Sequence, residues 1–147
     1  MKTAFTDEQA IGVAPDAVWS RLTDWSDAPR WMPGVESMRA EGPLATGTVL
    51  RFVARGKERT STIAAVDPGR SITLRSVVGG VTADYTYTVR PAASGGSTLV
   101  GLEALVGTRG IMTLLAPVIR GAIAREDGVQ LANLKSWVED AVSQTRP

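Results

Sequence analysis

The chain has 147 residues, enough for one domain with a single core, and its 16 basic and 15 acidic side chains leave a formal charge of +1. No run of like charges is longer than a pair, so we expect neither nucleic acid nor an anionic membrane as a partner. Cysteine and histidine are absent. Their absence excludes disulfides, Cys-His and Ser-His-Asp catalysis and metal sites built on either residue.

The N-terminal residues 1–13 carry one early lysine and no apolar stretch, so we expect no signal peptide. The longest apolar stretch, 111–119, is interrupted by Thr113 and Pro117 and is far shorter than the roughly 20 residues that span a bilayer. We therefore expect residues 1–147 to form one cytoplasmic domain without a membrane span. We also expect no metal, because without His and Cys only scattered carboxylates could serve as ligands. No cofactor is expected, because no phosphate-binding loop is present.

The first predicted elements are a strand and a short helix. Residues 4–13 are compatible with a strand that has Phe5 on its apolar face. Pro15 suits the first turn of a helix, where its missing N–H loses no partner. Val18, Trp19 and Leu22 then recur at helical spacing, which predicts an amphipathic helix from Pro15 to about Trp25.

From Val49 onward, short β-prone runs alternate with turn signals. Connections this short join antiparallel strands, so the pattern predicts a meander. Its clearest strand is 81–89, in which apolar and aromatic residues alternate strictly with polar ones. The turn signals are Gly56, Asp67-Pro68-Gly69, Gly79-Gly80 and Ser94-Gly95-Gly96.

After Gly107 the apolar residues recur at intervals of three and four, which predicts one long amphipathic helix. Pro117 would break a hydrogen bond inside a helix, so the main helix is predicted to begin near it, with 111–116 as a separate turn or a kinked lead-in. The periodic residues are Ile111, Leu115, Val118, Ile119, Ala122, Ile123, Leu131, Leu134, Val138 and Ala141. A curved antiparallel sheet of about six or seven strands around this helix is an α+β fold that leaves room for an apolar cavity.

Several motifs in this order resemble the START-like superfamily, specifically its bacterial polyketide cyclase/dehydrase-like members. The resemblance implies a helix-grip fold that encloses an apolar cavity between the sheet and the C-terminal helix, with short helices after the first strand. It does not define a function, because one fold of this kind serves many. The motifs are Ile11-Gly-Val-Ala-Pro15, Val18-Trp19, Asp24-Trp25, the segment 29–35, Gly47-Thr48, the segment 66–70, the segment 96–99 and the segment 131–135.

Trp31 follows the short helix in a proline-rich irregular segment, where a cavity mouth is often built, so a ligand role and simple packing are both open. Residues 25–35 and 107–116 are expected to border the entrance and to be more mobile than the sheet, since both contain helix breakers. The ligand-binding residues that we predict are Trp31, Phe52, Leu74, Tyr85, Tyr87, Leu115, Ile119, Ile123 and Asp127.

Three of these residues are also the catalytic candidates. Tyr85 and Tyr87 share one strand face, and a buried hydroxyl needs a hydrogen-bonding partner. Asp127 lies on the apolar stripe of the long helix, where an unpaired carboxylate is uncommon. An ion pair with Arg120, on nearly the same helix face, is the alternative to a cavity role for Asp127, whereas Glu126 is expected to face solvent.

Three functions are compatible with these features. The first is binding or carriage of an apolar, ring-containing small molecule. The second is a polyketide cyclase or dehydratase, which would need an acid or base in the cavity. The third is a protein-interaction module of the co-chaperone-like branch, which an apolar patch on the outer sheet face would favour. The ligand, any reaction and the oligomeric state stay open.

Overall fold

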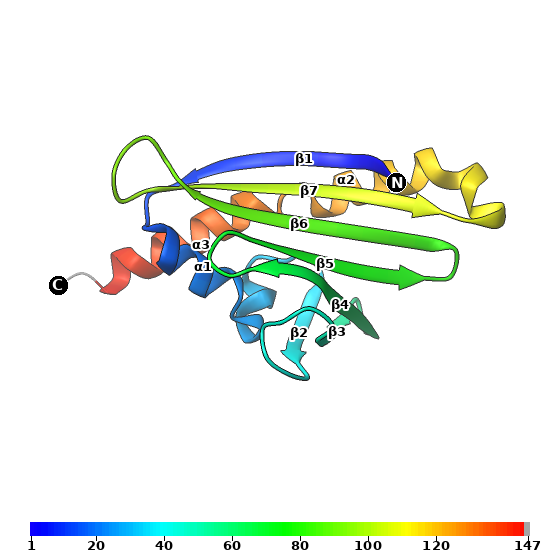
Figure 1. Cartoon of the computed structure of the whole chain (residues 1–147), viewed down its shortest axis with the longest axis horizontal. Helices are drawn as coiled ribbons and strands as arrows, with labels where there is room; N and C mark the ends of the chain where they lie inside the picture. The colour runs from blue at the N-terminus through cyan, green and yellow to red at the C-terminus, as the bar shows by residue number, and fades with distance from the viewer. Residues whose placement is uncertain (146–147) are drawn as a thin grey trace.

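The computed structural model describes residues 1–145, with side chains as far as Ala141. One antiparallel sheet has the strand order β1-β7-β6-β5-β4-β3-β2, so β1 and β2 are its edges (Figure 1). The predicted meander is therefore confirmed and continues into β7. The strands are β1 (Lys2–Ile11), β2 (Val35–Ala40), β3 (Val49–Ala54), β4 (Lys57–Asp67), β5 (Ser71–Val78), β6 (Val81–Pro91) and β7 (Thr98–Thr108).

Tight turns join the strands of the meander where the sequence has glycine. The β3–β4 turn consists of Arg55 and Gly56, with φ of 50° and 77°. A two-residue hairpin turn of type I′ requires positive φ at both central positions. Arg55 is the one non-glycine residue with positive φ among the described residues, and its N–H donates to the Gly34 carbonyl at 3.0 Å. This turn therefore lies against the loop that precedes β2.

The two faces of β6 differ as its alternation predicts, with one correction. Tyr87 and Val89 are buried on the inner face, whereas Thr88 is exposed. Asp84 was expected on the wet outer face, yet it is buried. Its cross-strand neighbour Arg75 covers it and donates two hydrogen bonds of 2.7 Å to its carboxylate. A bidentate pair of this kind shields a carboxylate even on a solvated face.

Two short helices follow β1, as the resemblance implied. They are α1 (Pro15–Leu22) and the 3-10 helix η1 (Trp25–Arg30). The predicted helix from Pro15 thus ends before Trp25, which begins η1 and is buried. The first strand also lies two residues earlier than expected.

The C-terminal helix is not continuous. The 3-10 helix η2 (Gly110–Leu115) precedes α2 (Ala116–Asp127), and α3 (Gln130–Thr145) follows after a break at Gly128 and Val129. The predicted start near Pro117 is confirmed, and 111–116 is a separate turn. The break was not predicted, because the three-and-four spacing continues across it. A Cβ on Gly128 would lie 2.4 Å from the Ala124 carbonyl oxygen, so this close approach requires glycine.

The helices cover one face of the sheet (Figure 1). Leu131, Leu134 and Val138 of α3 are buried against the inner face of the sheet, together with Val18 and Leu22 of α1. Helix α2, like α3, contacts β1 and β7, but none of its residues is fully buried. The result is the helix-grip fold that the sequence predicted. Within the described residues, no helix has the length and apolar character needed to cross a membrane.

Candidate functional site

A cavity of about 270 Å³ lies between the inner sheet face and the junction of α2 with α3. Strands β2 to β6 form one wall, Met32 and Pro33 after η1 form a second, and the junction of the two helices forms the third. Most of the wall is apolar. Its polar groups lie both on the helix side and on the sheet, where Ser61 and Ser76 share a hydrogen bond of 2.7 Å. The lining residues are Met32, Pro33, Val35, Met38, Phe52, Ala54, Arg55, Arg59, Ser61, Leu74, Ser76, Ala83, Tyr85, Tyr87, Glu126, Asp127 and Gln130.

Four polar side chains form a hydrogen-bonded chain across the cavity. The Tyr85 hydroxyl donates to the Asp127 carboxylate, and the Tyr87 hydroxyl donates to the Gln130 side-chain carbonyl. The Gln130 amide then donates to Asp127 Oδ1 at 3.2 Å. The sheet and both C-terminal helices therefore meet in one polar network, in which each hydroxyl has a partner.

Burial controls the protonation of this network. Removal from water raises the pKa of the Asp127 carboxyl above its ordinary value, although hydrogen bonds from Tyr85 and Gln130 act in the opposite direction. Burial, followed by the nearby Asp127, also raises the pKa of both tyrosines. The tyrosines are therefore hydrogen-bond donors rather than bases, and Asp127 is the group whose charge can change in the cavity.

Charged side chains stand at the mouth of the cavity. Arg55 in the β3–β4 turn pairs with Glu126 at the end of α2, at 3.4 Å, and both side chains are more than half exposed. An exposed pair of this kind contributes at most about 1 kcal/mol. Glu126 is exposed as expected. Arg120, the predicted partner of Asp127, forms no salt bridge with it among the described side chains.

With this geometry established, the chain was compared with known proteins. The model of the family described as polyketide cyclase / dehydrase and lipid transport matches residues 2–139. The chain belongs to this family. A comparison with curated protein sequences finds no match.

Several solved protein structures have the same fold as this chain. The ZhuI aromatase/cyclase from Streptomyces sp. R1128 is 16% identical with a TM-score of 0.76, covering 94% of each chain. The di-domain aromatase/cyclase BexL of the BE-7585A biosynthetic pathway is 18% identical with a TM-score of 0.79, covering 99% of this chain and 48% of that one. Norcoclaurine synthase from Thalictrum flavum is 16% identical with a TM-score of 0.66, covering 97% of this chain and 87% of that one.

The predicted site residues of this polyketide cyclase/dehydrase family member fall into two groups. The structure brings Phe52, Leu74, Tyr85, Tyr87 and Asp127 together around the cavity. Leu115, Ile119 and Ile123 lie outside it. The two isoleucines belong to α2, which contacts β1 and β7, two strands that do not line the cavity. Leu115 is exposed, and the two isoleucines are half-buried.

Trp31 lies behind the cavity wall. Its side chain is 1% exposed and packs edge-on against the Tyr87 ring, with centroids 5.6 Å apart and planes at 87°. Its indole Nε1 is buried without a hydrogen-bond partner among the described residues. The structure thus places Trp31 in the core, where it positions Tyr87. Of the two segments expected at the entrance, 25–35 contributes Met32, Pro33 and Val35 to the lining, whereas 107–116 contributes none.

Sequence reasoning missed Gln130, Arg55 and Arg59. Gln130 lies three residues after Asp127, a spacing that places two side chains on one helix face, so helical spacing could have identified it. Arg55 lies in the β3–β4 turn and Arg59 lies on β4 after it; both are exposed, and nothing in their sequence context marks them.

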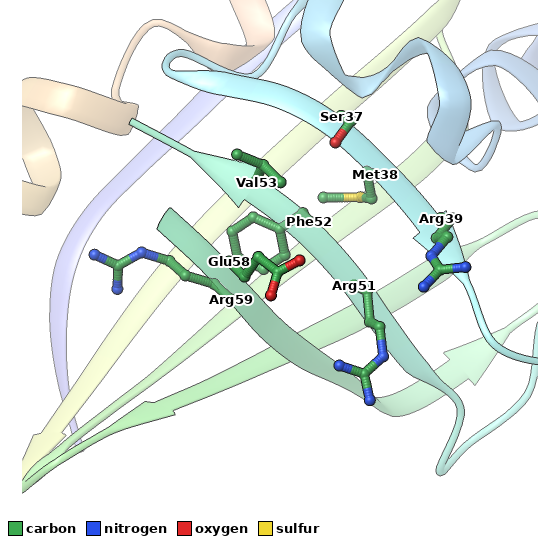
Figure 2. Close-up of a pocket in the computed structure, with 8 residues that line it drawn as sticks. All are labelled: Ser37, Met38, Arg39, Arg51, Phe52, Val53, Glu58 and Arg59. Carbon is green, nitrogen blue, oxygen red and sulfur yellow. The ribbon is translucent and has the colours of Figure 1, made fainter. Parts of the chain in front are cut away.

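A second hollow of about 210 Å³ lies on β2, β3 and β4 (Figure 2). Met38 and Phe52, which are cross-strand partners, point toward each other there and also line the main cavity. The remaining walls are mainly exposed charged side chains, so this hollow lacks the apolar enclosure of the main cavity. Its lining residues are Ser37, Met38, Arg39, Arg51, Phe52, Val53, Glu58 and Arg59.

The Tyr87–Gln130 hydrogen bond is expected to stabilise the fold measurably. Tyr87→Phe or Gln130→Leu leaves a buried polar group without its partner, which costs about 1–3 kcal/mol. The double variant removes both groups, so its loss should be clearly smaller than the sum of the two single losses. Denaturant unfolding of the four proteins measures this coupling, and strictly additive losses would contradict it.

Proposed function

We propose that this protein binds or carries an apolar ring-containing small molecule in the cavity between the sheet and the C-terminal helices. The observation that carries the proposal is an apolar-walled cavity with one connected polar network at its helix side. A wall of this kind buries a hydrophobic ligand, while a few polar groups fix its orientation. Its volume of about 270 Å³ is near the lower end of the roughly 300–1,000 Å³ usual for ligand pockets, which favours a ligand of one or two rings.

Catalysis of a cyclase or dehydratase type is the second candidate, and Asp127 favours it. A carboxyl with a raised pKa is suited to general acid work. In a dehydration, neutral Asp127 would protonate a leaving hydroxyl, which departs as water. The resulting carboxylate would then take a proton from the adjacent carbon as the double bond forms. Tyr85 would hold Asp127 in place through its hydrogen bond.

The protein-interaction alternative has less support. It required an apolar patch on the outer sheet face, but the described outer positions of β5 and β6 are mainly polar. Thr73 and Thr86 share a hydrogen bond of 2.8 Å there, beside the Arg75–Asp84 ion pair. The absence of a nucleic-acid partner and a cytoplasmic location stay predictions.

A matched pair of substitutions on β6 tests ligand binding in the cavity. Ala83 lines the cavity, whereas Thr82 beside it faces the outside. Ala83→Trp should fill the cavity and weaken binding of the neutral fluorescent probe N-phenyl-1-naphthylamine several-fold in a titration. Thr82→Trp adds the same side chain outside the cavity and should leave the affinity near that of the unmodified protein.

Equal affinities for the two variants would place the probe elsewhere and contradict the proposal. Native mass spectrometry of protein purified from its own host provides a second test. A bound molecule that is retained by the Thr82→Trp protein and lost from the Ala83→Trp protein would identify the ligand. Turnover of that molecule, abolished by Asp127→Asn, would establish the catalytic candidate.

A further inference from the structure

Exposed large hydrophobic side chains gather at one end of the molecule. Ile111, Leu114 and Val118 are 77%, 81% and 67% exposed. They belong to η2 and the start of α2, which lie at the same end as the β5–β6 turn and the start of β1 (Figure 1). We call this surface the apolar end. Its members are Met1, Val77, Val78, Ile111, Leu114, Leu115 and Val118.

The segments that form this surface are held together by defined contacts. The Arg109 N–H donates to the Gly80 carbonyl at 2.8 Å, which ties the start of η2 to the β5–β6 turn. A Cβ on Gly80 would lie 2.7 Å from the Arg109 carbonyl oxygen, so the two segments are in close contact. Yet neither η2 nor α2 buries a single residue fully. Contiguous exposed apolar surface on a folded protein commonly marks a site of interaction.

The segment that carries most of the apolar end has charges of one sign, whereas Val77 and Val78 share a hollow with Lys57, Glu58 and Arg59. The segment 104–125 contains Arg109, Arg120 and Arg125 and no acidic residue, and Lys2 pairs in register with Val106 beside it. None of these four cations forms a salt bridge among the described side chains. The cations are dispersed along the sequence, which is why no anionic partner was expected from it. In the fold, Lys2 of β1 pairs beside the segment that contains the three arginines.

We propose that the apolar end docks on the surface of an anionic lipid bilayer. Apolar side chains on short helices can enter the headgroup region, while flanking arginines and lysines are attracted to anionic lipids. The elements are too short to span the bilayer, so the contact is peripheral. A twofold contact with a second copy would instead place the same unpaired cations against one another, which disfavours that occupant.

Docking would also bring the cavity close to the bilayer. Val77 and Val78 directly follow Ser76, which lines the cavity. An apolar ligand could then pass between lipid and cavity with little exposure to water. This consequence rests on the proposed function, whereas docking itself does not.

Sedimentation with vesicles tests the docking. The unmodified protein should sediment with vesicles that contain phosphatidylglycerol and much less with pure phosphatidylcholine. The double variant Ile111→Asp/Leu114→Asp should reduce the bound fraction at least fivefold. Arg120→Glu should weaken binding to the anionic vesicles by more than the roughly fivefold expected for one cation, because it also reverses a charge. Val129→Asp is the matched control, since Val129 is 48% exposed but lies between α2 and α3, and it should bind as the unmodified protein does.

Three outcomes would overturn the proposal: no sedimentation with either vesicle, equal loss for the Val129→Asp control, or self-association in analytical ultracentrifugation that the double aspartate variant abolishes. Circular dichroism verifies that each variant is folded. Titration of the variants with N-phenyl-1-naphthylamine in the absence of vesicles separates the two proposals. Unchanged probe affinity with lost vesicle binding supports docking alone, and the converse pattern supports the cavity alone.

Discussion

Trp31→Ala is expected to lower the free energy of unfolding by about 3–5 kcal/mol, the usual loss when a buried aromatic side chain is truncated. Trp31 is 1% exposed, and its ring packs edge-on against Tyr87. Removal leaves a void behind the cavity wall and frees Tyr87, whose hydroxyl donates to Gln130. The loss should therefore affect both the core and the polar network. Denaturant unfolding followed by far-UV circular dichroism measures it.

Two further substitutions make this result specific. Trp31→Phe keeps an aromatic ring against Tyr87 and removes an indole N–H that has no partner, so its loss should be less than half that of the alanine variant. Trp19→Ala removes a tryptophan that is only partly buried, and it should cost clearly less than Trp31→Ala. A loss below about 1 kcal/mol for Trp31→Ala would show that Trp31 is not a core residue in solution.

The architecture could be predicted because the signals that define it are local. The alternation along β6 and the glycine-containing turns specify a meander, and Pro117 marks a helix start. The break at Gly128 could not be predicted in this way. Its φ of −63° is ordinary for a helix, and the apolar spacing continues through it. The break is visible only in the structure, where Gly128 ends α2 with a ψ of −12°.

The position of each residue along α2 determines which of the predicted residues line the cavity. Asp127 is the last residue of α2 and Gln130 the first of α3, so both face the cavity from the junction. Ile119 and Ile123 share the periodicity of Asp127, but they lie further from the junction on α2, which contacts β1 and β7, two strands that do not line the cavity. A pattern with a period of 3.6 assigns residues to one helix face, but a cavity can border only part of that face.

The pH dependence of stability, together with that of ligand affinity, should identify Asp127 as the titrating group in the cavity. Burial raises its pKa, so the carboxyl stays neutral in the folded protein at pH values where it would be ionised in the unfolded chain. Its contribution to stability is therefore fully present below the ordinary value of 3.8 and is lost as the pH rises through the raised pKa. Asp127→Asn should remove this decline from the unfolding free energy.

Ionisation of Asp127 should have a large effect on the affinity for an anionic aromatic probe. Two like charges about 8 Å apart repel each other by about 2 kcal/mol at an effective dielectric constant of about 20. Affinity for 1-anilinonaphthalene-8-sulfonate should thus fall more than tenfold between about pH 4 and pH 8, as Asp127 ionises. Affinity for the neutral N-phenyl-1-naphthylamine should change little. The other charged groups that line the cavity are Arg55, Arg59 and Glu126.

Substituting each of the two acidic residues shows which of them causes the pH dependence of the affinity for the anionic probe. Asp127→Asn should abolish most of the pH dependence for the anionic probe. Glu126→Gln should leave most of it, because that side chain is half exposed and paired with Arg55, so water and the guanidinium screen its charge. Ala83→Trp, which fills the cavity, distinguishes probe in the cavity from probe on the apolar end. If Glu126→Gln removes the pH dependence and Asp127→Asn does not, the acid of the cavity is not Asp127, and the dehydratase candidate loses its proton donor.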